Sequence, residues 1–376
     1  MSINEKIMNI TFRCDSSIEI GIGHVMRCLT LAHALKEYGI QCSFICREHK
    51  GNIINHIKEQ GFVVHSLPLT PDSALHIQDS KLAHSHWLGT SQEQDAKECI
   101  TLLDQKQKPD WLIIDHYALD AIWESALRPY CKKIMVLDDL ADRNHDCELL
   151  LDQSLGREQR DYQHYLFPNA KLLLAPKYLL LRMPFADAAL KSKQSRPREN
   201  IKNIFISMGG MDSHNYISQI LPALIALHKK SPITANILIS SSAPHIKELY
   251  SIQKKLPFCV SIYNNCSAND LVDLMLKADM AISASSFTSY ELVCMYVPTL
   301  LFTLSEIQYK VAKELVTFAP VSIFEPQIEN IQDRLIEEIY NMMGVLESDK
   351  CMENYSSKDT YIDGKGIQRV IQYLME

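Results

Sequence analysis

The sequence lacks the patterns that mark several common classes of protein. Its eleven cysteines are an odd number scattered without a Cys-x-x-Cys pair, a usage that points to a reducing compartment rather than to a disulfide framework. Basic residues form no long run and the net charge is -7, so nothing suggests nucleic acid as a partner. No apolar run approaches the roughly 18 residues of a membrane span, and residues 1–6 lack the charged-then-apolar layout of a signal peptide. We therefore expect a cytoplasmic protein without stable membrane association.

Familiar catalytic and metal-binding motifs are missing as well. There is no nucleophile elbow, Walker loop or kinase motif. His76, His84 and His86 fall in one loop without cysteines or carboxylates at ligand spacing, so we interpret them as polar loop residues rather than zinc ligands. Asp138 and Asp139 would point opposite ways along a strand, which favours turn residues or an orienting acid over a metal site. The sequence therefore predicts no metal centre.

The length of 376 residues suits two domains of about 150 to 200 residues each. Short apolar runs alternate with helical patterns twice, first over residues 8–151 and again over residues 204–318. The stretch 191–200 is charged, poor in apolar residues and contains a proline, as in a linker. We predict an N-terminal domain over 1–190, a linker over 191–200 and a C-terminal domain over 201–376, and we leave open that the last helix packs back on the N-terminal domain.

Strands that are apolar along their whole length, such as 111–115, are typical of parallel sheets with both faces covered. Because strands and helices alternate, we expect two doubly wound, Rossmann-like α/β domains facing a central cleft. Ligands of such sheets bind beyond the carboxyl ends of the strands. The candidate site residues are therefore those that follow strands, at 15–24, 116–117, 138–139, 209–210 and 283–286.

Residues 10–38 carry the most informative of these patterns. An apolar strand ends near Phe12, polar residues follow, and a helical pattern begins behind Gly21, Gly23 and His24. The glycines allow a tight turn and the close approach of a ligand, and the free N–H groups of a first helical turn attract anions. An imidazole with an ordinary pKa of about 6.5 could take a proton from water there. The alternative is that His24 only caps the helix or fills a polar pocket.

Two strand-to-helix junctions in the C-terminal half have compositions that suit a phosphate. Gly209 and Gly210 would let backbone amides approach one, although a plain turn is the simpler explanation. Ser285 and Ser286 belong to a junction rich in hydroxyls, and Glu291 in the next helix could accept hydrogen bonds from both hydroxyls of a ribose. The alternative is ordinary N-capping by serine, with Glu291 on a solvated face.

Four motifs occur in order and together resemble one enzyme family. They are Phe12-Arg-x-Asp-Ser-Ser-x-x-Ile-Gly-x-Gly-His24, Leu112-Ile-Ile-Asp-His-Tyr117, Met208-Gly-Gly-x-Asp212 and Ile282-Ser-Ala-Ser-Ser286. The chain is similar to the UDP-sugar hydrolase family of pseudaminic acid biosynthesis, from about residue 7 to the ending Asp363-Gly-Lys-Gly-x-x-Arg369. This resemblance implies the two-domain GT-B glycosyltransferase fold. It also implies cleavage of UDP-2,4-diacetamido-2,4,6-trideoxy-β-L-altropyranose to UDP and the free sugar, without a metal or other cofactor.

The resemblance also implies roles for individual residues. His24 becomes the base that activates water for inverting attack at the anomeric carbon. Asp15, Gly21 and Gly23 would lie near the reacting sugar, and Tyr117 would contact it. The implied UDP site of the C-terminal domain contains six residues: Gly209, Gly210, Ser285, Ser286, Glu291 and Gln308.

The chain departs from the family pattern at three places. Many relatives carry a glycine pair where this chain has Ser285 and Ser286, a change that keeps phosphate contacts feasible. Ile307 stands where relatives carry a polar residue before Gln308, and it removes a polar group near the nucleotide site. Tyr290 precedes Glu291 at a point where relatives vary in residue and length.

We therefore expect a UDP-sugar hydrolase on a bacterial route to surface or flagellin glycans, whose partners are a UDP-sugar and water as co-substrate. A GT-B glycosyltransferase with a UDP-sugar donor is the first alternative, and it would need an acceptor groove or a membrane-binding face. A nucleotide-sugar binding protein without turnover is the second alternative. The Gly-x-Gly-His sequence argues against this second alternative.

Overall fold

The computed structural model describes residues 7–69, 82–105, 107–195, 201–326, 331–346 and 362–376. The chain divides into two compact units. Unit 1 contains residues 1–180 and 367–376, and unit 2 contains residues 181–366. Among the described residues, no helix has the length and apolar character needed to cross a membrane.

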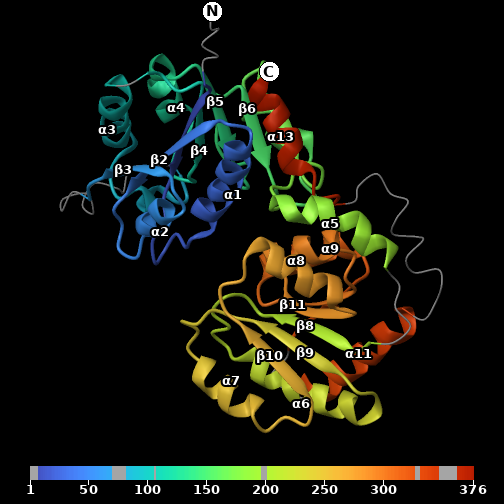
Figure 1. The fold of residues 1–376 in the computed structure, drawn as a ribbon. Coiled ribbons are helices and arrows are strands. Elements are labelled where there is room, and N and C mark those ends of the chain that lie inside the picture. Colours follow the sequence, from blue (N-terminus) through green and yellow to red (C-terminus); the bar gives the residue numbers. More distant parts are fainter. Residues whose placement is uncertain (1–6, 70–81, 106, 196–200, 327–330, 347–361) are drawn as a thin grey trace, which may run out of the picture. The chain divides into compact units, whose positions relative to one another are not determined.

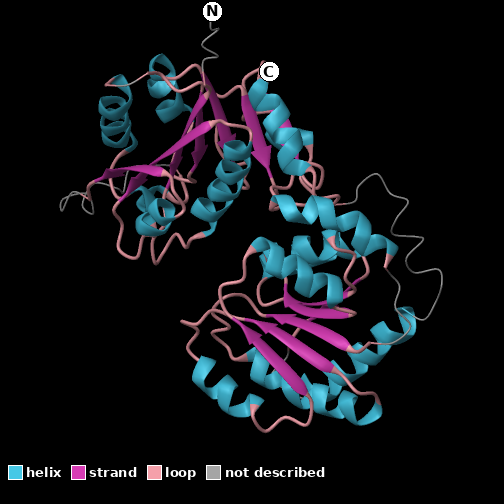
Figure 2. Cartoon of the chain, viewed as in Figure 1, coloured by secondary structure: helices cyan, strands magenta, loops and turns pink. Residues whose placement is uncertain are grey.

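Unit 1 is built on a parallel seven-stranded sheet in the order β3-β2-β1-β4-β5-β6-β7. Figure 2 draws strands in magenta and helices in cyan. Its strands are β1 Asn9–Cys14, β2 Gln41–Arg47, β3 Val63–Leu67, β4 Trp111–Asp115, β5 Lys133–Leu137, β6 Leu149–Asp152 and β7 Lys171–Leu174. The chain adds β2 and β3 on one side of β1 and then returns to place β4 on the other side. The carboxyl ends of β1 and β4 are therefore the topological switch point, where doubly wound sheets bind ligands.

Helices cover the sheet of unit 1 because its strands are apolar on both faces; every residue of β4, for example, is buried (Figure 1). The helices are α1 Gly23–Glu37, α2 Ile54–Glu59, α3 Gln92–Asp104, α4 Ala121–Leu127 and α13 Gly366–Met375, with 3-10 turns η3 Ser85–Leu88, η4 Arg128–Tyr130 and η5 Gln159–Tyr162. Right-handed crossovers place α1 and α2 on one face and α3 and α4 on the other. Although α13 is distant in sequence, it joins this unit, because the indole N–H of Trp111 donates to the carbonyl of Leu374 at 2.8 Å.

Unit 2 contains a parallel six-stranded sheet in the order β10-β9-β8-β11-β12-β13, with its switch point between β8 and β11. Its strands are β8 Asn203–Ser207, β9 Thr234–Leu238, β10 Cys259–Tyr263, β11 Met280–Ala284, β12 Thr299–Phe302 and β13 Val321–Phe324. Its helices are α5 Met183–Gln194, α6 Tyr216–Lys230, α7 Ile246–Gln253, α8 Ala268–Lys277, α9 Phe287–Cys294, α10 Glu306–Val316 and α11 Ile331–Leu346. Figure 1 shows α6, α7 and α11 on one face of this sheet and α8 and α9 on the other. A cluster of buried side chains lies under α6 and α11.

The prediction of a linker at 191–200 is wrong for its first residues. Lys191–Gln194 form the last turn of α5, and residues 196–200 lie outside the described part. The charged residues suggested a linker, but they occupy the exposed side of an amphipathic helix. The other side of this helix buries Phe185, Ala186 and Ala189. Strand β7 was also not predicted, because it has only four residues and begins with an exposed lysine.

Candidate active site

The switch point of unit 1 carries the loop that precedes α1. Gly21 has a φ of 77°, a left-handed conformation that favours glycine, and its N–H donates to the carbonyl of Ser17 at 3.0 Å. Neither Gly21 nor Gly23 would bring an added Cβ within 4 Å of another residue, so the space beside both is open. The cap residue of α1, Ile22, has no side-chain hydrogen bond to the first turn, and that turn holds no acidic side chain. The loop thus leaves room and exposed amides beside His24.

His24 is paired with a carboxylate from the neighbouring strand. Its Nδ1 lies 2.5 Å from Oδ1 of Asp115, the last residue of β4, and both side chains are buried. Although burial alone would raise it, the pKa of Asp115 is held below its usual range by the guanidinium of Arg27 and by His24. An ionised carboxylate only accepts hydrogen bonds, so Nδ1 carries the proton and Nε2 has a free lone pair. No described residue hydrogen-bonds to that Nε2.

Arg27, one turn further along α1, fixes this carboxylate from a second direction. It binds Asp115 in a bidentate manner, with Nε at 2.5 Å from Oδ2 and Nη2 at 2.7 Å from Oδ1. Its remaining nitrogen, Nη1, donates to Asp139 after β5. Arg27 was not predicted from the sequence, although a cation among the buried residues of α1 is a signal that could have indicated it.

Tyr117 lies directly against His24. The two rings meet edge to face, with centroids 4.5 Å apart. The hydroxyl of Tyr117 donates to Oδ2 of Asp139 at 2.7 Å, so this tyrosine and Arg27 share one carboxylate. Burial first, and then the negative charge of Asp139, raises the pKa of Tyr117, which keeps the phenol protonated at neutral pH. Asp139 therefore fixes the Tyr117 ring, which packs against His24.

Asp15 is completely buried at the end of β1. Its Oδ1 accepts hydrogen bonds from Arg13 and from the backbone N–H of Arg47, both at 2.6 Å. Its Oδ2 lies 3.2 Å from Nε2 of His116 and 3.4 Å from Nε2 of His49. Although burial opposes ionisation, Arg13 and the two histidines hold the pKa of Asp15 well below its usual range. Asp15 thus ties together the loops after β1, β2 and β4, and its contact with a sugar stays a prediction.

The ion pairs continue from Asp15 into the body of unit 1. Arg13 and Arg47 both bind Asp95 on α3, each through Nη2 at 2.7 Å, and all three side chains are fully buried. The indole N–H of Trp123 also donates to Asp95, at 2.9 Å. Losing one member of such a cluster leaves uncompensated buried charge at a cost of about 3–5 kcal/mol. The cluster therefore fixes Arg13 and Asp15, from which the chain continues into the loop that carries His24.

In unit 2, the predicted glycine and serine residues lie at the corresponding switch point. Gly209, with a φ of 82°, and Gly210 follow β8, and an added Cβ at either would meet nothing within 4 Å. Ser285 follows β11 and is 3% exposed, and its hydroxyl has no hydrogen-bond partner among the described residues. Ser286 is the cap residue of α9, whose first turn has no side-chain cap. A buried unpartnered hydroxyl beside uncapped helix amides is an arrangement that suits an anion.

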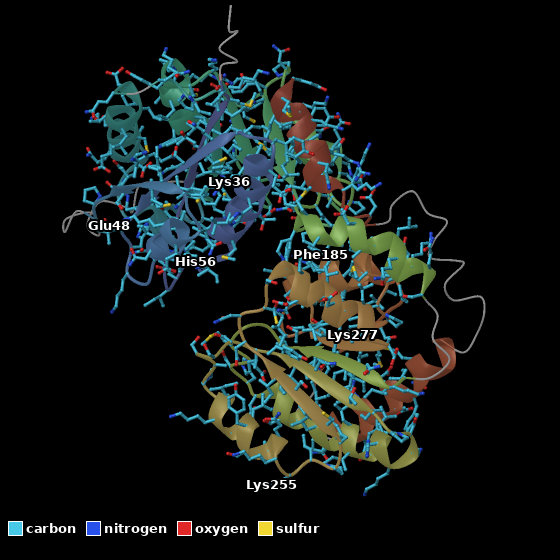
Figure 3. All side chains as sticks on the ribbon, in the orientation of Figure 1. Lys36, Glu48, His56, Phe185, Lys255 and Lys277 are labelled. Atoms are coloured by element: carbon cyan, nitrogen blue, oxygen red, sulfur yellow. The ribbon has the colours of Figure 1, made fainter. Side chains whose placement is uncertain are left out.

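Glu291 lies one turn into α9 and is 2% exposed, so it is not on a solvated face. Both hydrogen bonds from Arg182, at 3.0 and 2.7 Å, go to Oε1, and no described residue donates to Oε2. Burial raises the pKa of Glu291, and Arg182 opposes that shift. Phe185, labelled in Figure 3, anchors α5 against α9, since its carbonyl accepts from the thiol of Cys294. One carboxylate oxygen is thus fixed and the other stays available.

The remaining predicted positions differ in their surroundings. Oε1 of Gln308 accepts from the backbone N–H of Leu304 at 2.8 Å, so its carbonyl oxygen holds the loop before α10. Ile307 is 76% exposed, and Tyr290 is buried with its ring against Phe287. His76 lies outside the described residues. Within the described part of the chain, no three histidine, cysteine or carboxylate side chains gather in a way that could hold a metal ion.

Comparison with known proteins places the chain among distant relatives. No family model matches it. It is 28% identical over 292 residues to the UDP-2,4-diacetamido-2,4,6-trideoxy-beta-L-altropyranose hydrolase of Campylobacter jejuni, covering 76% of this chain and 88% of that protein. It is 24% identical over 375 residues to the spore coat polysaccharide biosynthesis protein SpsG of Bacillus subtilis, covering 98% of each. The chain is a distant homologue of both proteins. An uncharacterized protein of Methanocaldococcus jannaschii is 24% identical over 305 residues, or 80% of this chain, and the chain spans only 57% of that protein.

Solved structures confirm the predicted fold. MurG of Acinetobacter baumannii matches with a TM-score of 0.62 at 14% identity, covering 98% of this chain and 99% of that one. The glycotransferase of kitacinnamycin matches with a TM-score of 0.61 at 12% identity, covering 99% and 100%. The two parallel α/β units therefore belong to the GT-B fold, as the resemblance implied.

Proposed function

We propose that this chain is a UDP-sugar hydrolase that cleaves UDP-2,4-diacetamido-2,4,6-trideoxy-β-L-altropyranose to UDP and the free sugar. The observation that carries the proposal is the geometry of His24, whose Nδ1 is fixed by Asp115 at 2.5 Å while Nε2 has no described partner. Such a histidine is prepared to accept one proton at Nε2. The distant homology to the Campylobacter jejuni hydrolase supports this substrate.

In the proposed reaction, Nε2 of His24 takes a proton from water as the water oxygen attacks the anomeric carbon. The new carbon–oxygen bond forms on the face opposite to the bond that breaks, so the configuration inverts. The electron pair of the broken bond leaves with the diphosphate of UDP. Asp115 stabilises the imidazolium that forms, and Arg27 prevents Asp115 from moving or taking the proton itself.

Unit 2 would contribute the nucleotide site. The amides after β8 and at the start of α9, together with the hydroxyl of Ser285, would hold the diphosphate and stabilise its growing negative charge. The free Oε2 of Glu291 would accept hydrogen bonds from the ribose hydroxyls. Because UDP is a good leaving group, binding the phosphates and placing one base beside one water are the main tasks of such an enzyme.

The test is hydrolysis of the UDP-linked diacetamido sugar in water enriched in oxygen-18, with EDTA and without any sugar acceptor. We expect equal amounts of UDP and free sugar, with the label on the anomeric hydroxyl and none on UDP. His24→Ala should lose turnover and keep UDP binding, whereas His33→Ala, an exposed histidine on the same helix, should behave as wild type. Label on UDP, or a fully active His24→Ala, would contradict the proposal, and release only after an acceptor is added would indicate a glycosyltransferase.

A further inference from the structure

An aromatic cluster that the proposed mechanism does not use extends outward from His24. Trp87, in the 3-10 turn η3, stacks on Tyr117 with ring centroids 5.8 Å apart and planes 24° apart. The ring of His84 contacts both of these rings, with its centroid 4.2 Å from that of Trp87 and 5.6 Å from that of Tyr117. The Trp87 ring is also 6.1 Å from that of His24. The three rings of His84, Trp87 and Tyr117, from two separate segments, therefore form one continuous wall beside the candidate base, His24.

The surroundings of Trp87 differ from those of the two other tryptophans in the chain. Trp111 and Trp123 are 4% and 1% exposed, and each indole N–H donates to a protein oxygen, Leu374 and Asp95 respectively. Trp87 is only half-buried, and no described residue accepts a hydrogen bond from its indole N–H. A buried tryptophan normally finds such a partner, so the half-buried Trp87 offers an indole N–H donor that no described residue uses.

His84 adds to the apolar character of this wall. Burial, followed by the nearby imidazole of His86, lowers the pKa of His84, so its ring is neutral at neutral pH. A neutral imidazole against an indole extends the aromatic surface without adding a positive charge. One cation, the guanidinium of Arg143, lies 5.7 Å from the centroid of the Tyr117 ring, and it is paired with Asp138 and Asp142. The rings of Trp87 and His84 themselves suit a group with apolar faces and a few hydrogen-bond acceptors.

We propose that Trp87, with His84 and Tyr117, forms the sugar subsite and selects N-acetylated deoxy sugars. The inference rests on the proposed function and deepens it. The C–H bonds of a deoxy sugar and the methyl groups of its acetamido substituents pack on the negative faces of aromatic rings. The indole N–H donates to an acetamido carbonyl oxygen. A sugar with hydroxyl groups in place of these substituents loses both contacts.

The test measures binding apart from turnover, so that its outcome does not depend on hydrolysis. Calorimetry in the His24→Ala background compares the intact UDP-linked diacetamido sugar, UDP-N-acetylglucosamine and UDP alone. Trp87→Ala should weaken binding of the diacetamido sugar about tenfold, and Trp87→Phe, which keeps the stacking and loses the N–H, about threefold. UDP binding should not change in either variant. Phe167→Ala, an exposed aromatic elsewhere in unit 1, is the matched control and should change none of the three.

Turnover then separates a binding role from a structural one. In the active protein, Trp87→Ala should raise KM for the diacetamido sugar and reduce its kcat/KM advantage over UDP-N-acetylglucosamine. If kcat fell equally for both sugars with KM unchanged, Trp87 would only support Tyr117 and the inference would be overturned. It would also be overturned if Trp87→Ala bound the diacetamido sugar as tightly as its parent, or if the sugar added nothing to the affinity of UDP. Selective binding without hydrolysis would uphold the subsite and refute the proposed reaction alone.

Discussion

The sharpest prediction concerns Asp115, because the substitution Asp115→Asn removes one charge without changing the shape of the side chain. In the wild type, the hydrogen-bond partners of this carboxylate among the described residues are all donors: Nδ1 of His24, two nitrogens of Arg27 and the thiol of Cys28. An asparagine must point its NH2 group at one of these donors. If it faces His24, the imidazole adopts the other tautomer, with its proton on Nε2, and the ring can no longer accept a proton from water.

Two magnitudes follow from this geometry. The same Asp-to-Asn change beside the histidine of a serine protease triad lowers kcat by about 10⁴, so we expect a loss of about 10³ to 10⁴, or about 4 to 5.5 kcal/mol of transition-state stabilisation. The variant should also lose about 3 kcal/mol of folding free energy. This loss is at the low end for a broken buried pair, because Arg27 keeps its contact with Asp139. The assays are initial rates of UDP release and unfolding in urea.

Asp139→Asn is the matched control, because Asp139 also binds Arg27 but does not contact His24. We expect its kcat to stay within about tenfold of the wild type, since the tautomer of His24 is unchanged. The reasoning is refuted if folded Asp115→Asn retains kcat within about threefold of the wild type. Equal losses of kcat in the two variants would show that Arg27, rather than the His24 tautomer, controls the rate.

Three further predictions concern stability and nucleotide binding. First, the carboxylates of Glu124 and Asp138 overcome burial and raise the pKa of His145 to about 9. The contribution of His145 to the stability of unit 1 should therefore be fully present below pH 6.5 and fall by about 3 kcal/mol as the pH rises through 9, a slope that urea titrations should find absent in His145→Gln. Second, Arg182→Ala should destabilise unit 2 by about 2 kcal/mol at pH 7. The loss should be smaller at pH 4.5, because the raised pKa of Glu291 favours its protonated form there. Equal melting-temperature shifts at both pH values would contradict this. Third, Gly209→Ala forces a φ of 82° on a residue with a Cβ, so we expect a cost of about 1 kcal/mol and weaker UDP binding in calorimetry.

Much of the fold could be predicted because its central strands are short apolar runs. The strands 111–115 and 280–284 were expected within one or two residues, since a parallel sheet covered on both faces needs uninterrupted apolar side chains. Arg13 shows where this reasoning fails. It lies inside β1 and is fully buried, and its partner Asp95 is 82 positions further along the chain. Only the tertiary structure brings the two charges together.

The candidate site was predicted as a set of positions rather than as an arrangement. Residues after strands were chosen as the ones to examine, and the carboxyl ends of β1 and β4 adjoin at the switch point. That His24 binds Asp115, 91 residues away, depends on the rotation of α1 over the sheet, which apolar periodicity does not determine. Trp87 was missed because nothing in its local sequence distinguishes a packed tryptophan from an open one.

The discontinuity of unit 1 affects how the protein is made. Unit 2 is one continuous stretch, 181–366, inserted between the two segments of unit 1. A ribosome therefore releases all of unit 2 before it releases the helix whose Leu374 carbonyl binds Trp111. During synthesis, the N-terminal segment of unit 1, which contains His24, cannot complete its packing until residue 374 has been translated and α13 can bind Trp111. Nonsense mutations near codon 366 should consequently damage the N-terminal half of the molecule and spare the half in which they fall.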